Sequence, residues 1–580
     1  MGNYFLDNDD IQFLFNHIDL KELARIQEDR TPNGDATYGP VDEADAVDNY
    51  RRILEIMGEV AAETLAPNAE QVDREGNTLN DDGTVTYHPL VQENLTRLSQ
   101  ADMMGFTLPR KYGGLNCPCL LYTMATEMVS RADCSFMNMF GLQGIAETIY
   151  AFANDAIKDE ILPKFAYGQV TGAMVLTEPD AGSDLQAVRL RAFQDSNGNW
   201  YLNGVKRFIT NGCGEILLVL ARTEPDIADG RGLSLLLAER SPKVRVRHLE
   251  EKLGIHGSPT CELVFDDTPA RLIGERQRGL ITYVMALMNG ARVGIAAQSL
   301  GVAEAAYRLA RTYAHTRQQF GGPIERLPAV AELVTDMKIY IEAARALAYE
   351  TARVCDRENN NLRILESTPD LSKEEQKERK QLSRACKRIN GMLTPMSKYY
   401  CSEIAFSVAH DTILVLGGSG YMKDYAAERY LRDARITTIY EGTSQLQVVA
   451  AVRGVTSGAF ETYVADHEAK KYDDPLLAEL KQKLIHGKER VVEAIGFVKA
   501  KSTGYLDLAG RRLVDSAIAV IIGHLLLGQG AANERKKRVA RRFIESQMSV
   551  LEMNCQQIFA GDTTPMDEYE LLAGPVPAAE

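Results

Sequence analysis

A single carboxylate in a turn is the first residue of this sequence that could do chemistry. Glu441 stands between the aromatic Tyr440 and the turn-forming residues Gly442, Thr443 and Ser444. These neighbours predict a break between helices, with a carboxylate beside groups that can bind a phosphate or a ribose. An ordinary exposed turn that caps the following helix would use the same residue types. The tetrapeptide alone does not separate the two interpretations.

The segment MVLTEPDAGSDL offers a second set of polar groups. We expect a strand to end at Leu176 and Thr177 and to be followed by a loop that contains Gly182 and Ser183. Exposed N–H groups and small hydroxyls donate to a phosphate or a polar ring edge without adding bulk. A plain connection between two strands is the alternative.

Three further motifs carry candidate groups. In KRFITNG, Thr210 lies beside Phe208, an aromatic that could lie against a planar cofactor. In HTRQQFGGPI, Arg317 follows a long helix and suits a pyrophosphate, although an arginine there also compensates a helix dipole. In GGSGY, the glycines Gly417 and Gly418 permit close approach of a backbone, but the spacing is not that of a dinucleotide-binding fingerprint.

Composition excludes several classes of function. The formal charge of -15 and pI near 5.3 leave no cationic surplus for nucleic acid. Nine cysteines, an odd number, fit reduced thiols. No metal-ligand or serine-hydrolase motif is found. The N-terminus lacks the pattern of a secretory signal, and the apolar run from Ser516 to Gly528 is too short to span a bilayer. We therefore expect a soluble, cytoplasmic protein with no integral membrane segment.

Hydrophobic periodicity changes twice along the 580 residues. It predicts an antiparallel β domain between two helical domains, with an additional C-terminal helical domain. The expected fold class is therefore α+β multidomain, and we expect the β domain to be a barrel or sandwich and the second helical domain to be a four-helix bundle. The expected boundaries are an N-terminal helical extension at 1–40, a helical domain at 41–167, a β domain at 168–275, a helical domain at 276–455 and the additional helical domain at 470–580. Pro67 is expected to close a helix that begins near Asp45.

Taken together, LTEPDAGSD, FITNG, RQQFG, GGSGY and YEGTSQ resemble the FAD-dependent acyl-CoA dehydrogenases. The resemblance covers about 45–453 and extends to the longer members with an N-terminal segment and an extra C-terminal helical domain. It implies FAD as the cofactor, acyl-CoA as the substrate and an electron-transfer flavoprotein as the partner. It also implies an active homodimer or a dimer of dimers, since some cofactor contacts come from a neighbouring subunit.

The resemblance implies a set of cofactor-binding residues. They are Met174, Leu176, Thr177, Gly182, Ser183, Phe208, Thr210, Arg317, Gln319, Phe320, Leu414, Gly417, Gly418, Thr443 and Gln445. Three positions depart from the family pattern. Phe208 stands where Trp is usual, and Leu414 and Pro328 stand where Gln is frequent, so some hydrogen bonds to the cofactor are lost or supplied elsewhere.

Glu441 matches the family's catalytic base, which removes the α proton while the β hydride passes to flavin N5. Some relatives carry the base instead on the helix that holds NGARVG, but that position is Ala291 here, which cannot accept a proton. Residues expected at the substrate are Ser183, Asn289, Arg292, Tyr440 and Gly442. A structural salt bridge is the alternative role for Arg292.

The acyl chain is expected to be apolar. Relatives that act on glutaryl-CoA carry an arginine where this sequence has Met137, beside Phe136. Linear, branched, cyclic and sulfur-containing chains all remain open, and so does a coupled decarboxylation. Two other functions compete with the dehydrogenase: an acyl-CoA oxidase that uses oxygen, and a non-catalytic binding subunit, which the presence of Glu441 disfavours.

Overall fold

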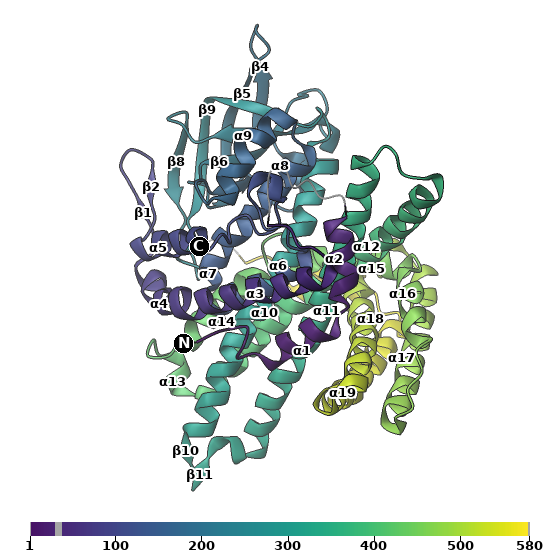
Figure 1. Cartoon of the computed structure of the whole chain (residues 1–580). Helices are drawn as coiled ribbons and strands as arrows, with labels where there is room; N and C mark the ends of the chain where they lie inside the picture. Colours follow the sequence, from purple (N-terminus) through teal and green to yellow (C-terminus); the bar gives the residue numbers. More distant parts are fainter. Residues whose placement is uncertain (1, 30–37, 578–580) are drawn as a thin grey trace. The chain divides into compact units, whose positions relative to one another are not determined.

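The computed structural model describes residues 2–29 and 38–577 and divides into two compact units (Figure 1). The first unit contains residues 1–386 and 397–444, and the second contains residues 387–396 and 445–580. The N-terminal helices, the β domain and the helices that precede Glu441 belong to the first unit, apart from residues 387–396 of α12 (Lys373–Leu416).

The N-terminal extension forms two helices where the sequence suggested one amphipathic segment. They are α1 (Asp9–His17) and α2 (Leu20–Glu28). The helix is interrupted because Ile18 takes an extended conformation and the Asp19 side chain caps the second helix by accepting from the Glu22 N–H. The predicted linker after this segment falls mostly at 30–37, outside the described residues.

Eight α- or π-helical segments of the described residues follow, before the first long strand. They are α3 (Glu43–Val60), a π-helical segment (Ala61–Leu65), α4 (Ala66–Glu75), α5 (Pro89–Gln100), α6 (Cys119–Ala132), α7 (Cys134–Gly141), α8 (Ile145–Phe152) and α9 (Asp155–Ala166). The expectation that Pro67 closes a helix is wrong. Pro67 lies in the first turn of α4, and the chain passes from α3 through the π-helical segment into α4 without leaving a helical conformation.

Seven strands build the β domain. They are β3 (Gly172–Val175), β4 (Arg191–Gln194), β5 (Trp200–Thr210), β6 (Ile216–Arg222), β7 (Leu233–Glu239), β8 (Val244–Leu249) and β9 (Thr260–Ile273). The sheet order is β3-β6-β4-β5-β9-β7, with β8 on β9 and a further β6–β7 pairing that curls the sheet toward a barrel. Side chains of β6 alternate between two apolar cores, with Leu218 and Leu220 in one and Leu217 and Val219 in the other.

The sequence suggested a purely antiparallel sheet, but the sheet contains a parallel pair. β3 pairs parallel to β6, with Gly172 opposite Ile216. A parallel pair needs a long connection, and the chain supplies it with the loop after β3 and the β4–β5 hairpin. β3 also ends at Val175, two residues before the expected end at Thr177. The Leu176 carbonyl accepts instead from Lys206 Nζ at 2.6 Å.

Long helices complete the first unit. They are a π-helical segment (Gly279–Val284), α10 (Met285–Thr316), α11 (Pro328–Ser367), α12 (Lys373–Leu416), α13 (Gly418–Tyr421) and α14 (Ala427–Thr437). A small hairpin of β10 (Gln318–Gln319) and β11 (Gly322–Pro323) follows α10. The charged insert lengthens the α11–α12 hairpin as predicted, and Ser372 and Glu375 form a capping box at the start of α12.

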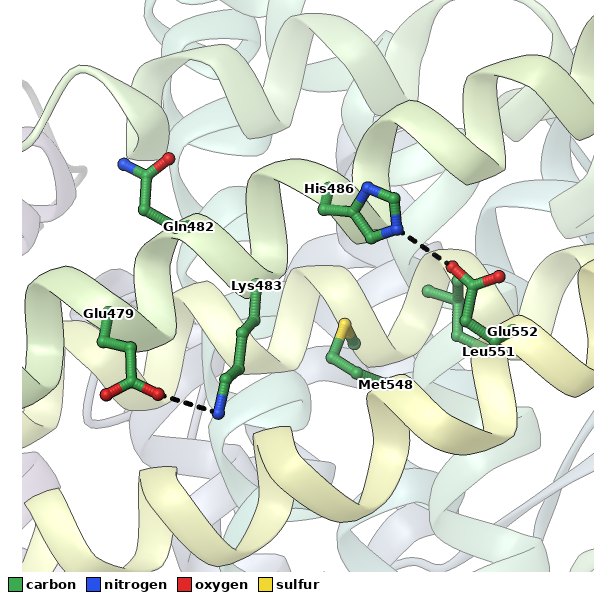
Figure 2. Close-up of a pocket in the computed structure, with 8 residues that line it drawn as sticks. Glu479, Gln482, Lys483, His486, Met548, Leu551 and Glu552 are labelled. Carbon is green, nitrogen blue, oxygen red and sulfur yellow. Dashed lines mark ion pairs between the residues drawn. The ribbon is translucent and has the colours of Figure 1, made fainter.

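The second unit is helical. It holds α15 (Ser444–Thr456), α16 (Ala459–Glu468), α17 (Pro475–Lys499), α18 (Thr503–Ala532), α19 (Glu534–Phe559), α20 (Thr564–Asp567) and α21 (Tyr569–Ala573), the first residue of α15 excepted. A cavity of about 340 Å³ lies between α17 and α19, where Met548 and Leu551 lie beside two ion pairs, Lys483 with Glu479 and His486 with Glu552 (Figure 2). None of the predicted site residues lines it.

Two helical stretches among the described residues are long and apolar enough to cross a membrane, Gly279–Thr316 and Thr503–Ala532. By its length in the sequence, the apolar run from Ser516 to Gly528 is too short to span a bilayer. In the structure this run lies inside a longer helix of 30 residues. The most apolar part of Thr503–Ala532 is 83% buried within the protein. The most apolar part of Gly279–Thr316 is 50% buried. Burial of this kind is also found in the core helices of proteins that do not enter membranes.

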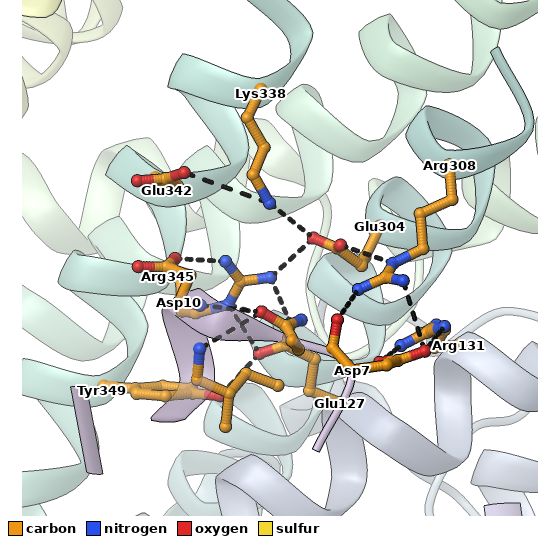
Figure 3. Close-up of polar contacts among 12 residues, drawn as sticks. Asp7, Asp10, Glu127, Arg131, Glu304, Arg308, Lys338, Glu342, Arg345 and Tyr349 are labelled. Atoms are coloured by element: carbon orange, nitrogen blue, oxygen red, sulfur yellow. Dashed lines mark hydrogen bonds and ion pairs between the residues drawn. The ribbon is translucent and has the colours of Figure 1, made fainter. Parts of the chain in front are cut away.

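A buried cluster of charges joins the N-terminal extension to the helical core (Figure 3). Arg345 of α11 is fully buried and donates to Glu127 of α6 at 2.6 Å, to Glu304 of α10 at 2.9 Å and to Asp10 of α1. Tyr349 also donates to Glu127, at 2.7 Å. Every carboxylate of the cluster therefore has a cationic or hydroxyl partner, which buried charges require.

Candidate active site

Glu441 occupies a strained turn between α14 and α15. Its φ is +55°, a left-handed conformation that is uncommon outside glycine, and Gly442 follows with a φ of +93°. The turn is held at its far end by Ser444, whose N–H donates to the Thr438 carbonyl at 2.9 Å and whose hydroxyl donates to Glu403 at 2.5 Å. Strain of this kind persists only where the surroundings determine the backbone, and it is concentrated at functional sites.

Two cations from different helices hold the same turn. Lys398 of α12 is fully buried, and its Nζ donates to the Gly442 carbonyl at 2.8 Å. Arg292 of α10 directs its Nε to the Glu441 carbonyl at 3.5 Å and donates from Nη1 to Asn289 Oδ1 at 3.1 Å. The predicted substrate-side residues Asn289, Arg292 and Gly442 are therefore brought together around Glu441.

Burial sets the protonation of the groups in this turn. It raises the pKa of Glu441, while the charges of Arg292 and Lys398 act in the opposite direction. Burial also lowers the pKa of Lys398 to about 7, despite the nearby carboxyl of Glu441, and lowers the pKa of Arg292. The result is a carboxyl whose proton affinity lies above that of an ordinary glutamate, as a general base requires.

Tyr440 anchors the turn from the other side. Its hydroxyl donates to Gln298 Oε1 of α10 and lies 3.2 Å from Asn138 Oδ1 of α7. Gln298 in turn donates to the Cys134 carbonyl at 2.9 Å. The Tyr440 hydroxyl is thus used within the protein, and its contact with a substrate stays a prediction. Met137 and Phe136, on the same helix as Asn138, are buried and apolar.

The loop after β3 is fixed by a buried ion pair. Lys206 Nζ lies 3.0 Å from Glu178, whose two carboxylate oxygens also accept from the Arg189 and Leu190 N–H groups, both at 2.8 Å. The Arg207 N–H donates to the Thr177 carbonyl at 3.0 Å. These contacts place Thr177, and the exposed Gly182 and Ser183 that follow, beside the end of β5.

Phe208 is aimed outward by a bulge. The β5–β9 register shifts between Lys206 and Ile209, and Phe208 has a φ of +59°. As a result Phe208 is 53% exposed, whereas every other residue of β5 is buried or partly buried, including Thr210 at the strand end. An exposed aromatic face beside exposed N–H and hydroxyl groups fits a planar cofactor that carries phosphates. Met174 is partly exposed, whereas the Leu176 side chain is buried and offers only its backbone.

The remaining predicted cofactor residues of this unit lie apart from this surface. Arg317, Gln319 and Phe320 are on the exposed β10–β11 hairpin, where the Phe320 ring is 90% exposed. Tyr313 links this end of α10 to the GGSGY element, because its hydroxyl donates to Ser419 at 3.3 Å. Leu414, Gly417 and Gly418 are exposed at the same place. Among the described residues, no hydrogen bond or ion pair joins the hairpin to the β domain. Thr443 closes the Glu441 turn, and Gln445 is exposed in α15.

Family models match the chain along most of its length. The acyl-CoA dehydrogenase N-terminal domain matches residues 48–169, the middle domain 173–268, the C-terminal domain 278–456, and a model described as "Acyl-CoA dehydrogenase C terminal" 456–558. The chain belongs to the acyl-CoA dehydrogenase family. Members are oxidoreductases that act on a CH–CH bond, so the predicted family, fold class and enzyme class are confirmed.

Relatives of this acyl-CoA dehydrogenase include an acyl-CoA dehydrogenase of Bacillus subtilis, 36% identical over 361 residues that cover 61% of this chain and 86% of the relative. A chain from a structure described as "Electron transferring flavoprotein of Acidaminococcus fermentans: Towards a mechanism of flavin-based electron bifurcation" is 31% identical, with a TM-score of 0.60, and covers 70% of this chain and 98% of its own length. An acyl-CoA dehydrogenase of Bacillus anthracis complexed with FAD has a TM-score of 0.75 at 22% identity, and the match covers 94% of this chain and 92% of the other. The last match shows that the fold is shared almost from end to end.

Sequence reasoning missed two parts of this acyl-CoA dehydrogenase site. Lys398 was overlooked because it is a single lysine in a helix with many other charges, although it lies in the largely apolar stretch MLTPMSKYYCSEIAF. That setting is the signal that could have found it, since a lysine there must be buried and paired. The Lys206–Glu178 pair joins the motifs KRFITNG and LTEPDAGSD, and nothing in the sequence links the two.

Proposed function

We propose that this protein is an FAD-dependent acyl-CoA dehydrogenase in which Glu441 is the catalytic base. The observation that carries the proposal is the strained Glu441 turn, clamped by Lys398 and Arg292, with a carboxyl whose pKa is raised by burial. Strained backbone at a non-glycine residue and a carboxyl with a raised pKa are both more frequent at functional sites than elsewhere.

The reaction needs a base on one face of the substrate and an electron acceptor on the other. FAD, when bound at the Thr177–Phe208–Thr210 surface, supplies the acceptor for the β hydride. Glu441 takes the α proton, and its own backbone N–H donates to the thioester carbonyl. That polarisation is required because an unactivated α C–H is far too weak an acid for a carboxylate. Arg292 and Lys398 hold the Glu441 and Gly442 carbonyls and thereby fix the direction of the carboxylate.

Two features support an apolar acyl group. Met137 and Phe136 are buried at the helix that also carries Asn138, and Met137 replaces an arginine that would recognise a distal carboxylate. An electron-transfer flavoprotein is the proposed electron acceptor, which agrees with the similarity to a chain from a structure of that kind of partner. The alternative is an acyl-CoA oxidase, in which oxygen reaches the reduced cofactor.

The proposed active assembly is a homodimer or a dimer of dimers. Phe320, Leu414 and Tyr421 expose large apolar surfaces at the hairpin and the GGSGY element. A neighbouring subunit that covered these residues would bury apolar area and bring Arg317 to its cofactor. A cytoplasmic location stays a prediction.

Bleaching of the flavin absorbance under anaerobic conditions tests the function. We expect one apolar acyl-CoA from a panel of linear, branched, cyclic and sulfur-containing thioesters to bleach the cofactor rapidly. Transfer of the electrons to an electron-transfer flavoprotein, with little oxygen consumption in air, would support the dehydrogenase, whereas stoichiometric oxygen consumption would support the oxidase. Full cofactor content with no bleaching by any thioester of the panel would contradict the proposed activity on these substrates. Purified protein that binds no flavin would favour the binding-subunit alternative.

Replacing Lys398 with methionine is expected to move the acid limb of kcat/KM to higher pH by roughly 1 unit. Below pH 7 Lys398 is charged and lowers the pKa of Glu441, so loss of the charge raises that pKa and protonates the base at a higher pH. Lys398→Arg keeps the charge and is expected to restore the wild-type limb. An unchanged limb in the methionine variant, with a lower melting temperature, would assign Lys398 a purely structural role.

A further inference from the structure

Two of the nine cysteines meet in the β domain, at the end of β5. Cys261 lies in β9 directly opposite Ile209 of β5, and the neighbouring pair is Thr260 with Thr210. The chain then turns back on itself: the Gly212 N–H donates to the Ile209 carbonyl at 3.1 Å and the Gly214 N–H to the Asn211 carbonyl at 2.8 Å. The turn thereby brings Cys213 back toward β9.

The turn that carries Cys213 lies very close to Cys261, as the position of Gly212 shows. A Cβ atom built on Gly212 would lie 2.8 Å from the Cys261 Cβ, so the turn is pressed directly against that side chain. Cys261 is part of the apolar core on this side of the sheet, and the partly buried Cys213 packs against that same core. Both sulfur atoms are reduced, and they belong to segments that the sheet already holds in register.

The two thiols differ in access and in chemistry. Cys213 is partly accessible, whereas Cys261 is completely buried. Cys213 Sγ also lies 3.7 Å from Asn211 Oδ1, which accepts a hydrogen bond from the Tyr87 hydroxyl at 2.5 Å. The neighbouring Cys261 thiol, Tyr87 and Arg240 lower the pKa of Cys213, whereas the Cys213 thiol and burial raise the pKa of Cys261. An accessible thiol that ionises readily, beside a second thiol, is the arrangement of a redox-sensitive pair.

We propose that Cys213 and Cys261 form a redox-sensitive dithiol that closes to a disulfide when the protein meets a hydroperoxide. The Cys213 thiolate attacks the peroxide, breaks its O–O bond and becomes a sulfenic acid, while the leaving oxygen departs as water or an alcohol. The Cys261 sulfur then attacks the sulfenic sulfur, the S–S bond forms, and water is released. Two thiols are oxidised by two electrons and one hydroperoxide is reduced by two.

Oxidation of this pair would affect the proposed cofactor surface, because the two cysteines lie beside Thr210. The disulfide would tie the Asn211–Gly214 turn to β9 next to Thr210, at the edge proposed to face the cofactor. This consequence rests on the proposed function, but the disulfide chemistry does not. A measurement of the cysteines themselves therefore separates failure of one proposal from failure of the other.

Peptide mapping of the full-length protein after treatment with hydrogen peroxide tests the pair. Free thiols are blocked by alkylation, and the protein is digested without reductant. We expect a cross-linked product that joins the Cys213 and Cys261 peptides, lacks two hydrogens relative to the separate peptides and disappears on treatment with dithiothreitol. Cys355, which is also partly accessible, serves as the internal reference and is expected to stay alkylated.

The variants identify the roles of the two sulfurs. In Cys261→Ser we expect loss of the cross-link and accumulation of a sulfenic acid on Cys213, trapped by dimedone. In Cys213→Ser we expect Cys261 to remain a thiol, and in Cys355→Ser we expect the cross-link to persist. The proposal is overturned if the wild-type protein gives no joined peptide while Cys213 is alkylated to the same extent as Cys355. It is also overturned if Cys213 is oxidised to a sulfinic acid with Cys261 left free. Both overturning results come from the wild-type chain, so a variant that fails to fold does not protect the proposal.

Discussion

Replacing Glu441 with glutamine is expected to lower kcat by about 10²- to 10⁴-fold while FAD stays bound, because the amide keeps the shape of the side chain but cannot accept the α proton. The cofactor surface is built from β3, β5 and the loop between β3 and β4, none of which contains Glu441. Steady-state reduction of an electron-accepting dye, together with the flavin content of the purified variant, measures both quantities.

The pH profile gives this substitution a second signature. Since the base must be unprotonated, kcat/KM of the wild type is expected to fall as the pH drops through the raised pKa of Glu441, at a higher pH than for an ordinary glutamate. The effect of this ionisation on folding stability is opposite to that of a carboxylate in an ion pair, whose pKa is lowered and whose ionisation stabilises the fold. A raised pKa in the folded state means that ionisation costs folding free energy, and the cost grows as the pH rises through it. We therefore expect Glu441→Gln to be at least as stable as the wild type near neutral pH.

Asp411→Asn is a matched control, since the pKa of Asp411 is also raised by burial but this residue lies on α12, away from the turn. It should leave kcat within a factor of about two of the wild type. A Glu441→Gln enzyme with wild-type turnover would remove Glu441 from the mechanism. Loss of flavin in that variant would mean that the turn supports the cofactor surface in addition to the base.

Replacing Arg345 with leucine is expected to reduce the free energy of unfolding by about 3–5 kcal/mol. The substitution removes the cation shared by Asp10, Glu127 and Glu304, all of which are buried (Figure 3). Burial alone would raise the pKa of Glu304, and the charges of Lys338, Arg345 and Arg308 hold it well below its usual range. Without Arg345, the carboxylates are left to repel one another or to take up protons at a free-energy cost.

Urea-induced unfolding of the two proteins, followed by circular dichroism, gives the difference. The loss should shrink as the pH is lowered, because protonation relieves the unpaired carboxylates. Arg25→Ala is the control, since it removes an exposed ion pair with Glu43 and should cost much less stability than the loss of a buried cation. Equal losses for Arg345→Leu and Arg25→Ala would show that the buried cluster contributes no more than a surface pair does.

Local pattern was enough to predict the fold class, and it failed where distant residues decide the structure. The alternation in β5 and the long apolar periods of α10 and α18 follow from burial of one face or of the whole element. The parallel placement of β3 depends on which strand it meets, and no period in the sequence carries that information. The domain boundaries and the roles of the site residues stay predictions.

The site shows the same division. Glu441 and its turn could be predicted because the residue types that make the turn are neighbours in the sequence. Lys398, Arg292 and Tyr440 act through contacts between helices, and the bulge that exposes Phe208 arises from its pairing with β9. Arg345 and Asp10 are separated by 335 positions, so their pairing becomes visible only after the chain has folded.

The charge cluster also decides which end of the chain tolerates alteration in the laboratory. Asp10 supplies one of the three acidic partners of Arg345, and the Gly2 N–H donates to Glu63 of the π-helical segment. An affinity tag fused to the N-terminus would disturb these contacts. Near the other end, Leu571, Leu572 and Val576 are largely exposed. A tag placed after Glu580 would leave the acidic complement of Arg345 intact, and a chain trimmed to begin at Val41 would not.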